Sequence, residues 1–233
     1  MGHSSMGRFD RFLRGEEGLF ITVEGGEGVG KSTFLNGLKT LFIESGISEE
    51  SLLLTREPGG TGLANEIRNI FTKVSKEEKL TPEAEYLLVS AARSQHLTHV
   101  VKPALRQKKV VLCDRFLDSS FVYQGALAGL DENFMKSIAD KIVGKLRPHV
   151  TFLLDCEVEV ALSRVLARAE QQGEAMSRYD AAEISVHEKI RKGFLEISEK
   201  EPERVIVLDA SLAQKNVLEA ASEWLLREGV LKS

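Results

Sequence analysis

The sequence has few cysteines and no long apolar segment, and these shortages exclude whole classes of protein. Only Cys113 and Cys156 occur in 233 residues, each inside an apolar run, so we expect buried free thiols rather than a disulfide framework. No uninterrupted apolar run approaches the roughly 18 residues of a membrane-spanning helix. None of the five histidines has partners at metal-ligand spacing.

An excess of positive charge is also missing. The chain carries 31 Lys and Arg against 35 Asp and Glu, a net charge of −4. Proteins that coat nucleic acids or bind anionic membranes rely on excess Lys and Arg, so we expect neither partner. Hydrophobic residues make up 42 % and charged residues 28 %, ordinary values that argue against disorder. These values favour a cytoplasmic enzyme or a binding protein for small ligands.

One domain accounts for the chain. Residues 1–14 begin with a polar, glycine- and serine-containing stretch that is typical of an expression tag, and they are left outside the predicted domain. Residues 15–233 contain no repeat, low-complexity tract or linker and fit a single α/β domain.

Short apolar runs alternate with amphipathic segments along this domain. The runs predict strands at 19–23, 51–55, 110–113, 150–154 and 205–208. The predicted helices follow Lys31 up to Gly46 and then cover 62–72, 81–103, 131–144, 157–170, 182–200 and 213–228. Unalternating apolar strands need helices on both faces of their sheet. The pattern therefore predicts a three-layer α/β/α fold with a mostly parallel five-stranded sheet.

A phosphate-binding motif joins the first predicted strand to the first helix. Residues 25–32 match G-x-x-x-x-G-K-[ST] at every fixed position, and a glycine-rich turn with an incidental lysine is the weaker interpretation. Backbone N–H groups of such a loop wrap an anion, with the helix N-terminus behind them. The predicted ATP-binding residues are Gly25, Gly26, Glu27, Gly28, Val29, Gly30, Lys31, Ser32 and Thr33.

The third predicted strand indicates which kind of nucleotide-binding protein this is. No N-K-x-D element for reading guanine occurs, and the strand ends in Cys113-Asp114-Arg115 rather than in Asp-Glu. We expect Asp114 to hold Mg²⁺ together with the Ser32 hydroxyl. Arg115 offers a planar fork for a second phosphate group. This combination favours a phosphotransferase over a hydrolytic switch.

Several further blocks resemble the bacterial thymidylate kinase family over about residues 19–212. They are Thr55-Arg-Glu-Pro-Gly-Gly-Thr61, Ala91-Ala-Arg93, Asp114-Arg-Phe-Leu-Asp-Ser-Ser-Phe-Val-Tyr-Gln-Gly125 and the segment from Leu154-Asp155 to Arg168. The resemblance implies a P-loop kinase that uses ATP and Mg²⁺ to convert dTMP into dTDP, for dTTP and DNA synthesis. It also implies a homodimer.

The same resemblance implies the residues that bind dTMP. Arg115 would clamp its phosphate, Glu27 its 3′-hydroxyl and Arg93 its thymine edge. Pro58, Ser119, Ser120, Tyr123 and Gln124 would complete the pocket, although Arg93 could instead be a solvated helix residue and Tyr123 a core residue. The isomer of the Glu57–Pro58 bond stays open.

One position departs from the family pattern. Val89 stands four residues before Arg93, where the family usually has a phenylalanine that stacks on thymine. Valine has no ring to stack, so the base wall would come from Leu88 or Phe71, or the pocket would be looser. This departure bears on base selectivity and leaves the reaction class unchanged.

Residues 168–180 are polar and are predicted to form a lid over the reacting phosphates. The catalytic residues implied are Lys31 and Arg115 with a lid arginine, for which Arg168 is preferred to Arg178. A phosphate acceptor is already dianionic near pH 7, so no general base is expected. Three alternatives stay open: a kinase for another monophosphate, a nucleoside kinase, and a nucleotide-binding module without catalysis.

Overall fold

A central sheet organises the chain. The computed structural model describes residues 8–72, 79–172, 179 and 182–231. Within these ranges the strands are β1 (Leu19–Glu24), β2 (Leu52–Arg56), β3 (Val110–Asp114), β4 (Val150–Asp155) and β5 (Val205–Asp209). All pairings are parallel and the order is β2-β3-β1-β4-β5. The predicted five-stranded parallel sheet is confirmed.

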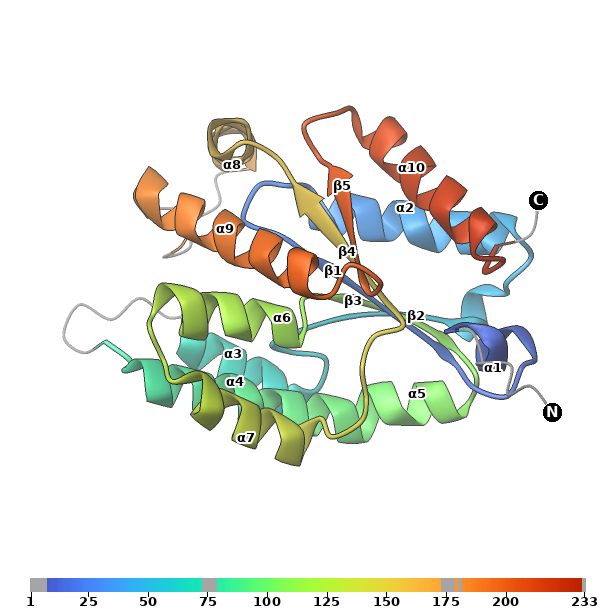
Figure 1. Cartoon of the computed structure of the whole chain (residues 1–233), viewed down its shortest axis with the longest axis horizontal. Coiled ribbons are helices and arrows are strands. Elements are labelled where there is room, and N and C mark those ends of the chain that lie inside the picture. Colours follow the sequence, from blue (N-terminus) through green and yellow to red (C-terminus); the bar gives the residue numbers. More distant parts are fainter. Residues whose placement is uncertain (1–7, 73–78, 173–178, 180–181, 232–233) are drawn as a thin grey trace.

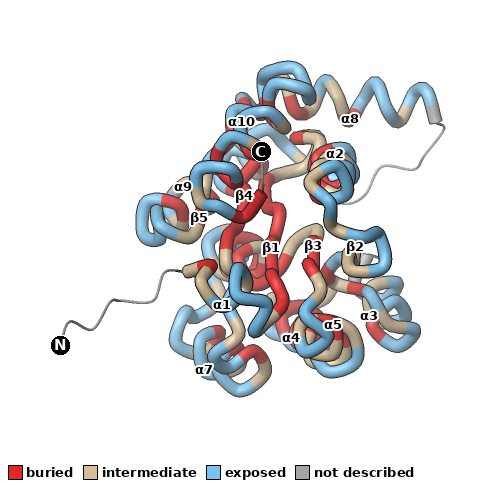
Figure 2. The backbone as a smooth tube through the Cα atoms, turned by 90° about the vertical axis from the view of Figure 1, so that its right-hand side faces the viewer, coloured by how far each residue is buried: buried red, intermediate tan, exposed pale blue. Residues whose placement is uncertain are grey.

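Helices cover both faces of the sheet, as Figure 1 shows. On one face, α2 (Lys31–Glu44) and α10 (Gln214–Arg227) pack against Ile21 and Phe152 in the larger hydrophobic core. The opposite face carries Phe20 and Val111. It is covered by helices that include α5 (Lys102–Arg106), α7 (Glu132–Ile142) and α9 (Ile184–Lys200). Figure 2 shows the buried strands enclosed by helices whose outer sides are exposed. The strands are apolar on both faces because both faces are covered.

The remaining helices connect these strands. They are α1 (Asp10–Leu13), η1 (Glu49–Ser51), α3 (Gly62–Thr72), α4 (Pro82–His96), η2 (Leu97–Val101), α5 (Lys102–Arg106), α6 (Leu117–Ser120), η3 (Phe121–Leu127), α7 (Glu132–Ile142), α8 (Val158–Gln172) and α9 (Ile184–Lys200). Helix α4 begins as its sequence predicts: the Thr81 hydroxyl accepts a hydrogen bond from Ala84 N at 3.2 Å, and Pro82 occupies the first turn. No helix in the described ranges is long and apolar enough to cross a membrane.

The N-terminal segment is part of the packed structure from residue 8 onward. Phe9 is only 4 % exposed, and its ring lies 5.9 Å from Trp224 and 6.3 Å from His149. The sequence interpretation left residues 8–14 outside the domain, because Phe9, Phe12 and Leu13 among charged residues are too few to give a periodic signal. Residues 1–7, which carry the tag-like pattern, lie outside the described ranges.

The topology places several polar residues at one edge of the sheet. In a parallel sheet all carboxyl ends lie on the same side, and ligands bind there. In this chain the phosphate loop follows β1, Glu57 follows β2 and Arg115 follows β3. Strands β1 and β3 are direct neighbours, with Val23 opposite Asp114. The candidate site is therefore built where these connections meet.

Candidate active site

The phosphate loop is held in shape by its glycines and by its own lysine. Gly25, Gly28 and Gly30 have positive φ angles of 137°, 75° and 91°. A Cβ on Gly28 would also lie 2.1 Å from the Ala161 carbonyl oxygen, so only glycine fits there. Lys31 Nζ donates hydrogen bonds to Gly25 O at 3.2 Å and to Gly26 O. Burial, reinforced by Arg115, lowers the pKa of Lys31 from its ordinary value.

Arg115 occupies a left-handed turn at the end of β3, with φ at 65°. Its guanidinium donates to Glu27 at 2.8 Å, to Gly25 O at 2.9 Å and to Ser119 Oγ at 3.1 Å. It also lies 5.2 Å from the centre of the Tyr123 ring. These contacts fix the arginine against the phosphate loop, where it can meet an anionic ligand.

Glu27 connects the phosphate loop to η3. Its carboxylate accepts hydrogen bonds from Arg115 at 2.8 Å and from the Tyr123 hydroxyl at 3.0 Å. Burial acts to raise the pKa of Glu27, but the charges of Arg115 and Lys31 and these two hydrogen bonds lower it to about 2. The residue is therefore a carboxylate at any physiological pH, suited to accept a hydrogen bond from a ligand hydroxyl.

A buried polar cluster stands behind the turn after β2. Arg93 is 2 % exposed and donates to Glu57 at 2.6 Å, to Phe116 O at 3.1 Å and to Ser120 Oγ at 2.9 Å. His96 contacts the other Glu57 oxygen at 2.9 Å. The Glu57–Pro58 peptide bond, left open by the sequence, is cis. The solvated interpretation of Arg93 is wrong, because its charge is neutralised inside the protein by Glu57.

A cavity of about 250 Å³ lies between these groups and the phosphate loop. All eight residues predicted to bind dTMP line it: Glu27, Pro58, Arg93, Arg115, Ser119, Ser120, Tyr123 and Gln124. Val89 lies in the same wall, with 5 % of its surface exposed. Tyr123 is buried as the core interpretation expected, yet it also lines the cavity. The structure brings the predicted set together.

The cavity also contains residues that the sequence analysis missed. Arg68 on α3 donates to Pro58 O at 3.0 Å, and burial lowers its pKa. Tyr179 packs edge-on against Tyr123, with ring centres 4.8 Å apart, and its hydroxyl lies 3.1 Å from Glu85. Gln124 donates to the same Glu85 carboxylate at 2.7 Å. No periodicity marks these residues, because each reaches the cavity from a different element.

Asp114 is the best-placed candidate for holding a metal ion. Its Oδ1 atom is buried and has no hydrogen-bond partner among the described residues. A hard cation such as Mg²⁺ suits such a carboxylate, with Ser32 at the start of α2 as the second protein ligand. The described residues contain no cluster of three His, Cys, Asp or Glu that could hold a metal on their own. The set therefore fits an ion that takes most of its ligands from phosphates and water.

The predicted lid is described only in part. Arg168 is exposed on α8 and lines the cavity. Arg178 and the rest of 173–178 lie outside the described residues. Arg164 donates to Ala210 O at 2.7 Å and to Ser211 O at 3.3 Å. It ties α8 to the connection after β5.

The architecture defines the general class to which the protein belongs. A strand, a G-x-x-x-x-G-K-S loop and a helix at the edge of a parallel sheet define a P-loop nucleotide-binding protein. The cavity beside that loop is lined by Arg93, Arg115 and Arg168. Such a cavity is typical of a kinase that binds a small phosphorylated acceptor.

Comparison with known proteins gives the family. The sequence model of the thymidylate kinase family matches residues 23–221. The thymidylate kinase of Protochlamydia amoebophila is 38 % identical over 90 % of this chain and 92 % of its own length. That of Geobacter sp. (strain M21) is 43 % identical, with 83 % and 85 % covered. The chain belongs to the thymidylate kinase family, whose members are dTMP kinases.

The fold agrees with this assignment. The crystal structure of thymidylate kinase from Ehrlichia chaffeensis superimposes with a TM-score of 0.72 at 28 % identity. The match covers 89 % of this chain and 98 % of that chain. The family expected from the sequence blocks is confirmed.

The carboxylate of Glu27 should stabilise the fold in a pH-dependent way. Its folded pKa of about 2 is below the ordinary 4.5, so its stabilisation is present above pH 4.5 and is lost as pH falls toward 2. Glu27→Gln should lower the free energy of unfolding at pH 7 on the order of 2 kcal/mol. Urea denaturation of both proteins from pH 7 to 3 measures the difference.

The difference between wild type and Glu27→Gln should shrink as the pH falls below 4.5. Glu223→Gln, on the exposed side of α10, is the matched control for loss of one carboxylate. A difference that stays constant down to pH 3 contradicts the ion pair with Arg115.

Proposed function

We propose that this protein transfers the γ-phosphoryl group of ATP to dTMP, giving dTDP as a precursor of dTTP. One observation carries the proposal: Glu27 belongs to the phosphate loop and also lines the adjacent cavity, where it contacts Arg115. A nucleoside triphosphate on the loop and a monophosphate held by Arg115 would thus have their phosphates at the same edge. In-line phosphoryl transfer needs this proximity above all.

Each cavity residue has a role that suits dTMP. Arg115 presents a planar fork to the acceptor phosphate, and Glu27 accepts a hydrogen bond from the sugar 3′-hydroxyl. The Tyr123 ring fills the space in which a ribose 2′-hydroxyl would lie, which favours a deoxyribose. Arg93, Ser120 and Gln124 line the deeper part of the cavity, where polar groups can read the edge of the base.

The donor side needs ATP, a metal ion and a cation over the transferring group. Lys31 and the loop N–H groups would bind the β- and γ-phosphates, and Ser32 and Asp114 would hold Mg²⁺, which would offset charge on the phosphates. Arg168 supplies the cation for the equatorial oxygens in the transition state, with Arg178 as the alternative within 168–180. A dianionic acceptor phosphate attacks without a general base.

Val89 supports a second candidate substrate class. It lines the cavity at the position where the family resemblance places a stacking phenylalanine. An aliphatic side chain contacts the base through dispersion alone and distinguishes thymine from other pyrimidines less well than a stacked ring. A kinase with activity on a related pyrimidine monophosphate is therefore the alternative function.

Substrate preference tests the proposal directly. ADP formation, measured in a coupled assay with ATP and Mg²⁺, should depend on dTMP, with kcat/KM for dUMP about tenfold lower because only a methyl group differs. UMP and dCMP should be poorer still. Activity on thymidine without activity on dTMP would contradict the proposal, and so would ATP turnover that needs no monophosphate.

The role of Arg168 has its own test. Arg168→Ala should lower kcat roughly 100-fold or more, because a cation that acts on the transition state is lost. The KM for dTMP should change little, since the acceptor phosphate is held by Arg115. Arg227→Ala, on the exposed face of α10, is the matched control. Equal losses in kcat and in dTMP affinity would show instead that Arg168 binds the substrate.

We further propose a cytoplasmic homodimer. Two free, buried cysteines suit a reducing compartment.

The proposed dimer interface consists of exposed apolar side chains on two adjacent helices. They are Leu63 and Ile70 on α3 and Leu87 on α4, which are 52 %, 56 % and 47 % exposed. Light scattering should give twice the chain mass of 25.8 kDa. The Ile70→Asp variant should shift the mass to that of the monomer, and an unchanged mass would locate the interface elsewhere.

A further inference from the structure

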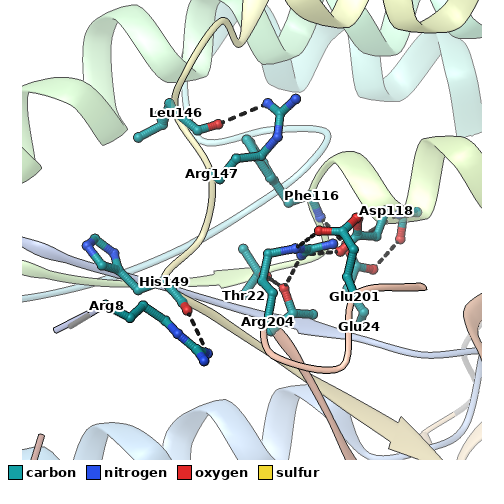
Figure 3. A network of polar contacts seen from close by, with 12 residues as sticks. Arg8, Thr22, Glu24, Phe116, Asp118, Leu146, Arg147, His149, Glu201 and Arg204 are labelled. Carbon is teal, nitrogen blue, oxygen red and sulfur yellow. Dashed lines mark hydrogen bonds and ion pairs between the residues drawn. The ribbon is translucent and has the colours of Figure 1, made fainter. Parts of the chain in front are cut away.

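Glu24, the last residue of β1, binds both the turn after β3 and helix α6. It is 1 % exposed, and its Oε1 accepts hydrogen bonds from Phe116 N at 2.7 Å and from Ser119 N at 3.3 Å. Its Oε2 accepts a third bond, from the Ser119 hydroxyl, at 2.6 Å. Figure 3 shows this carboxylate beside Phe116 and Asp118. No step proposed for the reaction uses Glu24, although it directly precedes the phosphate loop.

The segment that Glu24 binds contains the strained turn of Arg115. A non-glycine residue at φ 65° persists only where the surrounding structure holds it. Arg115 N donates to Val23 O at 3.0 Å, and the Cys113 thiol donates to Arg115 O at 3.1 Å. Phe116 O accepts from Arg93 at 3.1 Å. The remaining N–H of this turn, on Phe116, is the one that Glu24 binds.

A second connection runs from Glu24 to the Arg115 side chain. The Ser119 hydroxyl donates its hydrogen to Glu24, so its oxygen lone pairs are free to accept from Arg115 Nη1 at 3.1 Å. The carboxylate thereby sets the orientation of the hydroxyl that supports the guanidinium. Backbone and side chain of Arg115 both depend on one buried carboxylate.

We infer that Glu24 is a positioning residue that holds Arg115 in the conformation in which its guanidinium can bind the acceptor phosphate. The inference rests on the proposed function, since it assigns Arg115 to that phosphate. Glu24 itself is enclosed by Phe116 and Ser119 and acts through Arg115 without touching the substrate.

The protein maintains this carboxylate at a cost in stability. Burial and the charge of Asp118 raise the pKa of Glu24 to about 7, against the hydrogen bonds from Ser119 and Phe116 and the charge of Arg115. The charge of Glu24 in turn acts to raise the pKa of Lys31 on α2 and of Cys113 on β3. Because the folded pKa lies above the ordinary 4.5, the carboxylate destabilises the fold increasingly as pH rises from 4.5 to about 7.

Asp118 adds less to that cost than an unpaired carboxylate would, because Arg204 forms an ion pair with it. Arg204 binds both carboxylate oxygens of Asp118, at 2.8 and 3.0 Å (Figure 3). It also donates to Thr151 Oγ1 at 2.7 Å. Thr151 in turn shares a hydrogen bond of 2.7 Å with Thr22 on β1. This network reduces the repulsion between Asp118 and Glu24, which lets a second carboxylate stay buried beside the first.

Glu24→Gln separates positioning from general stability. The amide has the shape of the carboxylate, but it cannot accept hydrogen bonds on both atoms. At pH 8, above the folded pKa of Glu24, we expect kcat/KM for dTMP to fall about 10- to 100-fold through misplacement of Arg115. The KM for ATP should stay within about twofold, since the loop contacts of Lys31 are unchanged. At pH 8 the Tm should be equal to that of wild type or higher.

Glu223→Gln on α10 is the matched control, and it should leave all three values unchanged. A fall in Tm together with a rise in KM for both substrates would overturn the inference, because Glu24 would then support the whole loop region. A double-mutant cycle adds a second criterion. In an Arg115→Ala background Glu24→Gln should have almost no further effect on kcat/KM, and an undiminished effect there overturns the inference.

Failure of the proposed function can be told apart from failure of this inference. If the wild-type protein does not phosphorylate dTMP, the proposed function fails without any variant. The conformation of Arg115 still tests the inference in that case. A crystal structure of Glu24→Gln in which Arg115 keeps its left-handed φ and its contacts with Glu27 and Ser119 would overturn it. Loss of that conformation supports it.

Discussion

The parallel pairing of β1 with β3 is the constraint on which the site depends. It sets Val23 opposite Asp114, so the phosphate loop after β1 and the Asp114–Arg115 turn after β3 emerge side by side. The ion pair between Arg115 and Glu27, at 2.8 Å, then joins the two connections directly. Residues 88 positions apart in the sequence thus form one wall of the cavity. A register shift of one residue between β1 and β3 would displace these two connections relative to each other and turn the side chains of the shifted strand to the other face of the sheet.

Charge at the cavity is balanced between fixed partners. The chain as a whole carries a net charge of −4, yet Arg68, Arg93, Arg115 and Arg168 line a single cavity. Glu57 neutralises Arg93 in the interior, and Glu27 is bound to Arg115 at the rim. Paired arginines keep their geometry before a ligand arrives, which reduces the reorganisation that binding requires. The acidic average thus agrees with a pocket for two small phosphorylated ligands.

Much of the fold and part of the site followed from sequence patterns alone. The five apolar runs, the Thr81-Pro82 helix start and the glycine-rich loop are local signals, and the structure has each of them where they were predicted. The residues from Arg115 to Gln124 are consecutive in the sequence, from the turn after β3 through α6 into η3, so a single block of sequence identified them together. Their roles in binding and catalysis remain predictions that the proposed experiments test.

Other residues gave no local signal. From the sequence alone, Glu24 is predicted to be the polar end of a strand, Glu57 part of a turn and Arg68 a surface residue of a helix. Phe9, in a polar segment, did not mark the start of the packed structure. What defines these residues is burial against elements distant in sequence, as in the contact between Glu24 and Ser119 across 95 positions.

The amino-acid sequence by itself determined the fold class, the phosphate loop and the family, because periodicity and short motifs act over a few residues. Only the tertiary structure decided that Arg93 is buried, that Arg164 ties α8 to the connection after β5 and that Glu24 supports Arg115. Those outcomes depend on which strands pair and in what register. Desolvation and hydrogen bonding then act between residues that the chain brings together only on folding.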